Sequence, residues 1–281
     1  MSFVKKIIKY VLVIVIAAVL GSVGLDAVDH RGSINESVVG RIFFGTADSV
    51  CPAGMVLVEG SSKQFCIDQF EVSAGENCPH QDVSSEVQSK DNIDTGSCMP
   101  ISKIGTIPWR YITKQQAANA CAKAGKRLPT NEEWFAASLG TPDPNDQWGM
   151  DDCHVNKNWG ALPGLTGSGK NCQSGAGAYD MVGNVWEWVT GEAIDGVFEN
   201  RILPESGFVK EADSNGVAIA TDEVGSSPTY NKDYFWQKNT GQRAMARGGF
   251  WDNGQEAGLY SMYLEAPFSF VAEGVGFRCV K

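Results

Sequence analysis

The side chains best suited to redox or metal chemistry in this 281-residue chain are eight cysteines and three histidines. No two cysteines stand in the Cys-x-x-Cys spacing of many zinc sites and dithiol oxidoreductases. The histidines, His30, His80 and His154, form no cluster in the sequence. An even number of cysteines without tight pairs favours a disulfide framework over metal sites.

The pairing of the cysteines is open, because eight cysteines allow about a hundred connectivities. Three pairs of sequence neighbours bracket polar segments rich in turn residues, and the two remaining cysteines then form a long-range link. The resulting hypothesis is Cys51–Cys66, Cys78–Cys98, Cys153–Cys172 and Cys121–Cys279.

Oxygen ligands gather in the segment AYDMVGNVWEWV, residues 178–189. Asp180, Asn184 and Glu187 lie close together in a turn, and hard oxygen donors of this kind suit Ca²⁺. The alternative is structural: Asn184 and Glu187 satisfy buried backbone groups while the two tryptophans fill the core.

The first 29 residues predict an export signal or a membrane anchor whose amino terminus lies inside the cell. Lysines precede an uncharged run from Tyr10 to Leu25, and aspartates follow it. We favour a retained anchor in which residues 7–25 contact the membrane, with residues 30–50 as a spacer. Cleavage near Ser22-Val23-Gly24 would instead give a secreted protein.

Residues 51–281 are therefore expected on the exported side of the membrane, at the cell surface, where thiols oxidise. This part contains all eight cysteines. The net charge of −10 excludes nucleic acid as a partner, because nucleic-acid binding needs a basic surface.

Local patterns predict the elements that position these residues. Residues 51–72 predict a hairpin, and residues 73–100 a polar loop. Capping boxes predict one helix from about Thr113 to Ala124 and another that begins at Thr130 and ends before Gly140. The glycine-rich and acidic segment 191–245 is interpreted as a long surface insertion.

The closing segment, residues 247–281, is rich in aromatic residues and glycine. Between Leu259 and Glu265 large side chains alternate in a strand-like run, so one face can pack inward while the other points outward. Exposed aromatic residues suit recognition, because they give a large contact area at a low entropic cost. The other interpretation is that they form the core of a small sheet.

Five motifs in one order resemble the formylglycine-generating enzyme, or sulfatase-modifying factor, family. They are FCIDQFEV, RLPTNEEWFAAS, YDMVGNVWEWV, RGGFW and GFRC, and they extend through residues 51–281. The resemblance implies an α+β, C-type-lectin-like fold with two helices, short strands and long loops held by calcium and disulfides. It also implies a bond between a helix cysteine and one near the C terminus, here Cys121 and Cys279.

The same resemblance bears on metals. It implies that Asp180 and Glu187 bind Ca²⁺ through their side chains, and Gly183 and Val185 through their carbonyls. Members of the family that oxidise a sulfatase cysteine bind copper through two cysteines between the RGG-x-W and GFR motifs. This chain has no cysteine and no histidine from Phe250 to Phe277, so we expect no copper and no catalysis.

The closing segment also resembles the variable proteins of diversity-generating retroelements, which display hypervariable residues on this fold. The implied fixed frame is Arg247, Gly248, Gly249, Trp251, Gly254, Ala257, Gly258, Leu264, Ala266, Pro267, Gly276, Phe277 and Arg278. The implied ligand-binding positions are Phe250, Asp252, Glu256, Tyr260, Tyr263, Glu265, Phe268 and Phe270.

Two functions follow. The favoured one is a membrane-anchored, non-enzymatic protein that binds an extracellular protein or glycan through residues 247–281. The alternative is a formylglycine-generating-like oxidoreductase or maturation factor with a degenerate site, for which the nearby chemistry is Cys279, Asp233, Asp252 and Glu256.

Overall fold

The computed structural model describes residues 50–60, 63–144, 148–225 and 227–281. The predicted anchor and nearly all of the predicted spacer lie outside these residues. Within the described ranges, no helix has the length and apolar character needed to cross a membrane. Residues 51–281 form one compact unit.

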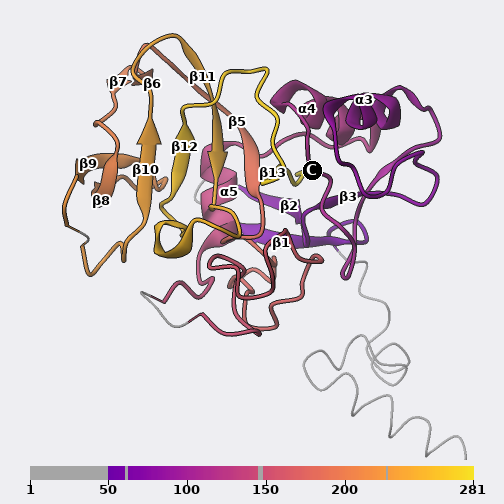
Figure 1. Cartoon of the computed structure of the whole chain (residues 1–281), viewed down its shortest axis with the longest axis horizontal. Helices are drawn as coiled ribbons and strands as arrows, with labels where there is room; N and C mark the ends of the chain where they lie inside the picture. The colour runs from indigo at the N-terminus through magenta and orange to yellow at the C-terminus, as the bar shows by residue number, and fades with distance from the viewer. Residues whose placement is uncertain (1–49, 61–62, 145–147, 226) are drawn as a thin grey trace, which may run out of the picture. The chain divides into compact units, whose positions relative to one another are not determined.

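The main sheet is built from segments that lie far apart in the sequence (Figure 1). Its strands follow the order β7-β6-β5-β11-β12-β10-β8-β9, and the short strand β13 pairs with β5 in parallel. Their bounds are β5 Trp186–Ile194, β6 Val197–Phe198, β7 Arg201–Ile202, β8 Gly207–Ala212, β9 Ala218–Asp222, β10 Tyr234–Gln237, β11 Gln242–Arg247, β12 Met262–Leu264 and β13 Val275–Gly276.

Two further strand pairs precede this sheet. The predicted hairpin is confirmed, because β1 (Met55–Glu59) and β2 (Gln64–Asp68) pair antiparallel. Strand β3 (Val72–Ala74) pairs with β4 (Pro100–Ser102) in the same way.

Both predicted helices are present, and a third one was not predicted. Helices α4 (Lys114–Lys123) and α5 (Asn131–Ser138) begin at the capping boxes of Thr113 and Thr130. The expectation of a loop over residues 73–100 was wrong in its second half, which forms α3 (Glu86–Asp94) with Ser85 as N-cap. Helix α3 is short and polar, so its sequence shows little apolar periodicity.

The interpretation of residues 191–245 as a surface insertion was also wrong. Five of the strands of the main sheet, β6 to β10, lie wholly in this segment, and Phe235 and Met245 are fully buried. The strands are short and are separated by turns rich in glycine and acidic residues. The composition of the segment therefore resembles that of a surface loop.

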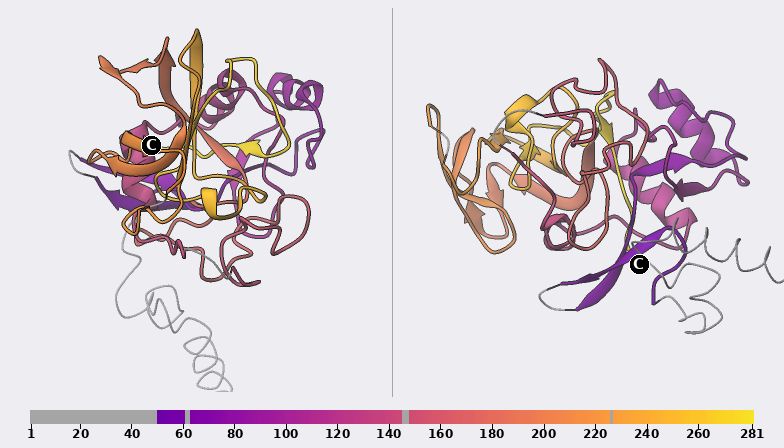
Figure 2. Two further views of the ribbon diagram at one scale, coloured as in Figure 1. Left: turned by 60° about the vertical axis from the view of Figure 1, so that its left-hand side comes forward. Right: turned by 90° about the horizontal axis from the view of Figure 1, so that it is seen from below.

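The main sheet separates two layers of the core. Side chains of Phe235, Met245 and Met262 belong to a cluster that includes Trp134 of α5. Side chains of the opposite face, among them Trp188 and Ala246, belong to a second cluster with α4. Figure 2 shows α5 and the α3–α4 pair in two further orientations.

The four disulfides are the four pairs that were hypothesised from the sequence, Cys51–Cys66, Cys78–Cys98, Cys121–Cys279 and Cys153–Cys172. Three of them close local loops, whereas Cys121–Cys279 joins α4 to the end of the chain across 158 residues. All eight cysteines of the chain are therefore in disulfides, and no free cysteine remains among them.

Candidate ligand-binding face

The predicted alternation in the closing segment is seen in β12. Met262 and Leu264 are fully buried beneath the sheet, whereas Tyr263 between them is half-buried on the other face. Strand β12 lies between β11 and β10, with Ala246 opposite Tyr263 on one side and Trp236 opposite it on the other. The sheet register therefore places Trp236 beside Tyr263.

Five aromatic side chains form a continuous row across β8, β10, β12 and the loop that follows β12. We call Phe208, Tyr234, Trp236, Tyr263 and Phe270 the aromatic row. Consecutive ring centroids along it are 5.1, 4.8, 6.5 and 6.0 Å apart. All five side chains are half-buried, so each has one side on the core and another open to solvent.

Buried tryptophans support the row from below. Trp186 lies 5.4 Å from Trp236 and 5.7 Å from Tyr263, measured between ring centroids, and it is itself buried. Trp188 lies 6.4 Å from Phe270, edge to face. A row held from beneath by packed rings is pre-organised, so a ligand would pay little ordering entropy on binding it.

Three carboxylates act electrostatically on Tyr234, which lies next to Trp236 in the aromatic row. Burial, followed by the charges of Glu256, Glu223 and Glu265, raises the pKa of the Tyr234 hydroxyl. None of these three carboxylates forms an ion pair with a described residue. Glu256 also lines a hollow of about 570 Å³ beside Phe208, together with Trp148, Lys232 and Gln255.

The structure brings together some of the predicted ligand-binding positions and separates others. Tyr263 and Phe270 are in the aromatic row, and Phe250 and Phe268 pack on the same cluster. The ring of Phe268 receives the Lys114 ammonium at 5.0 Å.

Asp252 and Tyr260 lie apart from this set. Asp252 pairs with Lys157 at 2.8 Å. Tyr260 packs against Phe135 and Tyr230 on the cluster of the opposite sheet face, with ring centroids 5.3 and 4.7 Å away.

The residues predicted as the fixed frame are mostly buried. Arg247, Phe277 and Arg278 are fully buried. Gly248 has φ +92°, and a Cβ there would lie 2.6 Å from the Met181 carbonyl oxygen. Gly254 and Pro267 are the two frame positions that are not buried.

Arg278 anchors the C-terminal segment to the core through buried hydrogen bonds. Its guanidinium donates to both carboxylate oxygens of Glu187, at 2.6–2.8 Å, and to the carbonyl oxygens of Asp68 and Tyr179. Trp134 Nε1 donates to the same carboxylate at 2.7 Å. Glu187 is thus fully engaged in a buried network.

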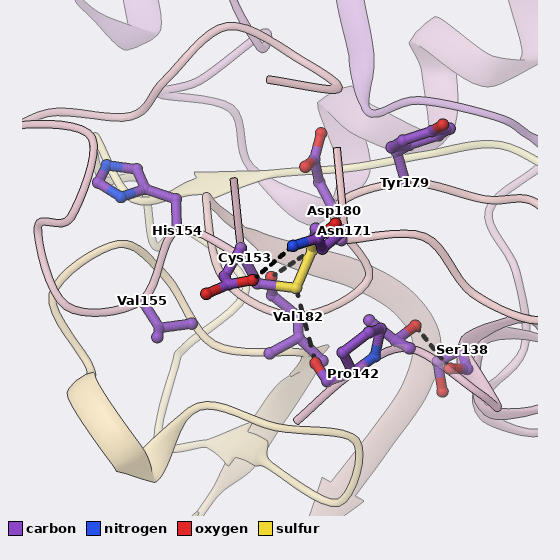
Figure 3. The surroundings of a disulfide bond; sticks show 12 residues. Ser138, Pro142, Cys153, His154, Val155, Asn171, Tyr179, Asp180 and Val182 are labelled. Carbon is purple, nitrogen blue, oxygen red and sulfur yellow. Dashed lines mark hydrogen bonds between the residues drawn. A yellow bond between two sulfur atoms is a disulfide. The ribbon is translucent and has the colours of Figure 1, made fainter. Parts of the chain in front are cut away.

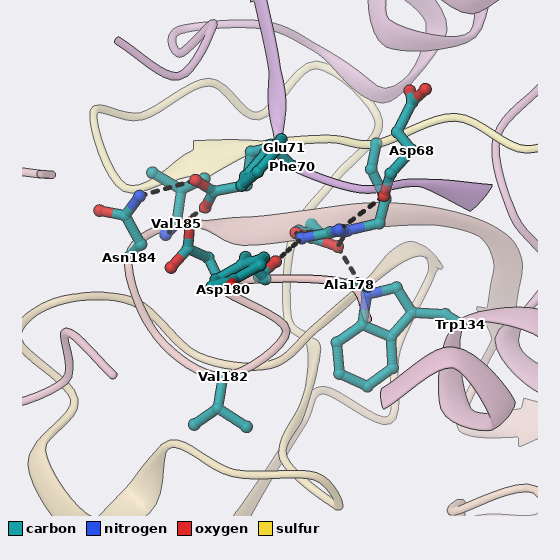
Figure 4. A network of polar contacts seen from close by, with 12 residues as sticks. Asp68, Phe70, Glu71, Trp134, Ala178, Asp180, Val182, Asn184 and Val185 are labelled. Atoms are coloured by element: carbon teal, nitrogen blue, oxygen red, sulfur yellow. Dashed lines mark hydrogen bonds and ion pairs between the residues drawn. The ribbon is translucent and has the colours of Figure 1, made fainter. Parts of the chain in front are cut away.

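The residues predicted to bind calcium fit an ion only in part. Asp180 is buried, one of its oxygens accepts from Gly167 N, and its Oδ1 has no hydrogen-bond partner. Glu187, however, is held by Arg278, and Asn184 donates to the Glu71 carboxylate at 2.6 Å (Figure 4). In the part of the chain that the structure describes, no three His, Cys, Asp or Glu side chains form a group that could hold a metal ion. Gly183 and Val185 flank Asn184 in this turn, and the Val185 amide donates to Glu71.

Burial governs the titration of this acidic cluster. It raises the pKa of Asp180 to about 7, and it raises the pKa of Glu71 well above its usual range. A buried carboxyl with an unused oxygen is a position where a proton or a cation is favourable.

Cys279 and Asp233, which the enzymatic alternative would use, already have structural partners. Cys279 is in a disulfide. Asp233 is buried and accepts from the Tyr260 amide at 2.6 Å, and burial followed by the neighbouring Asp143 charge raises its pKa. His154 follows Cys153 of the Cys153–Cys172 disulfide (Figure 3). Its ring stacks on Trp159 and hydrogen-bonds Asn158 Oδ1 and the Leu162 carbonyl oxygen.

Sequence reasoning missed three members of the aromatic row, Phe208, Tyr234 and Trp236. The signal available was YFW at residues 234–236, a short run of aromatic residues with Phe235 between two outward-facing neighbours. Its partner strands are distant in sequence, so the run alone could not place it beside residue 263.

A known protein family matches most of the chain. The family described as the sulfatase-modifying factor enzyme 1-like domain matches residues 40–281. An inactive C-alpha-formylglycine-generating enzyme 2 of Bos taurus is 34% identical over 137 residues, which cover 43% of this chain and 46% of the relative. The formylglycine-generating enzyme of Mycobacterium tuberculosis is 37% identical over 84 residues, or 25% of this chain and 28% of the relative.

The aligned part of this chain spans half or less of these curated relatives. Among solved structures, the Major Tropism Determinant I1 variant aligns with 82% of this chain and 53% of its own, at 18% identity and a TM-score of 0.43.

Proposed function

The chain belongs to the family of sulfatase-modifying factor enzyme 1-like domains, and from this premise we propose that it is a non-catalytic ligand-binding protein. In this proposal residues 247–281 display variable side chains to an extracellular protein or glycan, in the manner of a variable protein of a diversity-generating retroelement. The proposal includes the membrane anchor in residues 7–25, which would hold the domain at the cell surface.

The observation that carries the proposal is the division of residues 247–281 by burial. Eleven of the thirteen frame positions are buried, and all eight candidate ligand-binding positions are half-buried or exposed. A segment built in this way can change its outward side chains without changing its packing. The five-residue aromatic row supplies rigid contact area of the kind that dominates binding surfaces.

The absence of usable thiols supports a binding role over an oxidase role. All eight cysteines are paired, and Cys121 and Cys279 are fully buried. A thiolate is required both to bind Cu(I) and to exchange disulfides, and a buried disulfide supplies neither.

Saturation mutagenesis of residues 247–281 tests the display proposal, with protease resistance of the folded domain as the readout. We expect most substitutions at Phe250, Asp252 and Glu265 to leave resistance unchanged. Substitutions at Gly248 and Arg278 should abolish it. Equal sensitivity at the two sets of positions would contradict the proposal.

The enzymatic alternative has its own test. Oxygen uptake is measured with the copper-loaded full chain and a cysteine-containing sulfatase peptide, and formylglycine is sought by mass spectrometry. We expect no uptake above that of copper with denatured chain. Peptide-dependent uptake with product formation would establish the oxidoreductase instead.

We also propose that the chain binds Ca²⁺ near Asp180. The support is the unpartnered Asp180 Oδ1 and the surplus of buried carboxylates there, since Glu71, Asp180 and Glu187 face the single guanidinium of Arg278. A divalent cation bound at Asp180 would stabilise the charged form of these carboxyls.

A further inference from the structure

The binding surface is larger than the closing segment. Only Tyr263 and Phe270 of the aromatic row lie in residues 247–281, whereas Phe208, Tyr234 and Trp236 come from β8 and β10. The register joins the two parts directly, because Trp236 is the cross-strand partner of Tyr263 and Phe208 is the partner of Tyr234. An adjacent pair on one sheet face shares one contact surface.

The solvent-exposed side of the aromatic row is apolar, and three carboxylates act on it. Glu223, Glu256 and Glu265 act on the Tyr234 hydroxyl, and none of the three is paired with a described cation. Burial raises the pKa of Glu256, as expected for a carboxylate with no cation beside it.

Three cationic side chains have an ion-pair or hydrogen-bond partner within the domain. Lys210 lies 3.7 Å from the Asp222 carboxylate, and Lys232 bonds Gln255 Oε1. Arg243 donates to the carbonyl oxygens of Thr240 and Glu265. Only Lys210 meets a carboxylate, so Lys232 and Arg243 keep their charge, and the three unpaired carboxylates outnumber these two cations.

Aromatic faces and unpaired carboxylates together recognise one kind of group well. A guanidinium or ammonium stacks on a tyrosine or tryptophan ring and bonds a carboxylate at the edge, and its flat form favours arginine. An acidic glycan would be repelled, and a neutral glycan would leave the three carboxylates without charge complementarity.

We propose that the aromatic row of Phe208, Tyr234, Trp236, Tyr263 and Phe270, surrounded by Glu223, Glu256 and Glu265, binds a polypeptide segment with exposed arginine or lysine side chains. The inference rests on the proposed binding function and specifies the class of its partner. It also makes Trp236, outside the closing segment, the centre of the contact.

The test measures binding of the full chain to an immobilised Arg-Gly-Ser repeat peptide, with a Glu-Gly-Ser repeat as the control peptide. We expect binding to the basic peptide alone, weakened as salt rises because rim charges contribute through screened attraction. Trp236→Ala should raise the Kd at least about tenfold, as the loss of a central aromatic contact does.

Matched variants separate contact from folding. Trp236→Phe keeps a ring and should restore most of the affinity. The combined change Glu223→Gln, Glu256→Gln and Glu265→Gln should raise the Kd about tenfold and flatten its salt dependence. Ile202→Ala is a surface control, because Ile202 is 82% exposed on β7 at the other edge of the sheet, and it should bind normally.

Several results would overturn the inference. No binding of the basic peptide, equal binding of both peptides, or binding of a neutral oligosaccharide that Trp236→Ala abolishes would each assign the face to another partner. Loss of binding in Tyr263→Ala with normal binding in Trp236→Ala would confine the site to residues 247–281. That last outcome would leave the proposed function in place.

Discussion

At the scale of single residues, the sequence pattern was most informative where burial alternates. In β12 the predicted alternation is observed, with Met262 and Leu264 buried and Tyr263 half-buried, because period-two alternation is read locally. The hydrogen-bond partners were not predictable in this way. Glu187 was expected to bind calcium, but its carboxylate meets Arg278, which lies 91 residues further along the chain.

The Arg278–Glu187 pair gives a stability prediction. Both side chains are at most 1% exposed, so Arg278→Ala would leave a buried carboxylate without its partner. We expect a loss of about 3–5 kcal/mol in the free energy of unfolding, measured in urea. Lys170→Ala is the control, because its pair with Asp151 is 79% and 58% exposed, and it should cost less than about 1 kcal/mol. Similar losses in both variants would contradict the buried network.

Asp143 gives a pH dependence of defined sign. Burial raises its pKa from 3.8 to about 6 in the folded state, so the uncharged carboxyl stabilises the fold. This contribution is complete below about pH 4 and is lost as the pH rises through about 6. Asp143→Asn should therefore match the parent near pH 4 and gain on it by on the order of 2 kcal/mol near pH 8.

Urea unfolding of the two proteins across that pH range checks the Asp143 prediction. The quantity to follow is the difference between the two free energies of unfolding, which also includes the relief of the neighbouring Asp233 from the Asp143 charge at high pH. A difference that does not change with pH would contradict it.

At the scale of elements, the caps and the hairpin were predictable and the sheet was not. Thr113 and Thr130 begin helices through hydrogen bonds to the residue three positions later. The signal therefore lies within four consecutive residues and can be recognised in the sequence. The main sheet instead pairs β10 with β12 in parallel and β5 with β11 across about fifty residues of chain. Such pairings depend on tertiary packing, which is why residues 191–245 looked like an insertion.

The disulfides differ in what they connect, and this predicts unequal effects of removing them. Cys121–Cys279 closes a loop of 158 residues and Cys78–Cys98 one of 20. On loop entropy alone, replacing the long-range pair by two alanines should cost about 5 kcal/mol, and the local pair about 3 kcal/mol. Urea unfolding of the two double variants measures this. A larger loss for the local pair would show that Cys121–Cys279 adds little to the fold.

At the scale of the whole molecule, calcium binding is best tested by ligand linkage. A bound ion stabilises the folded state in proportion to the logarithm of its concentration over its Kd, by about 2.7 kcal/mol at a hundredfold excess. We expect a chelator to lower the melting temperature and added Ca²⁺ to restore it, with Asp180→Asn insensitive to both. A melting temperature that neither treatment changes would exclude a structural calcium ion.

Three parts of the molecule together position the proposed binding face. The core network around Arg278 holds the closing segment, the disulfide to Cys279 fixes its end, and the sheet places the aromatic row beside it. The family and the frame motifs were available from the sequence. The contribution of β8 and β10 to the face came only from the fold, because it depends on which strands lie next to β12.

The most direct test of the central claim is deep sequencing of codons 247–281 across a natural population of the source organism. We expect substitutions concentrated at Phe250, Tyr263, Glu265 and Phe270, with Gly248 and the Gly276-Phe277-Arg278 motif unchanged. A segment that is uniform throughout the population, or that varies equally at frame and outward positions, would contradict the display of a diversified binding surface.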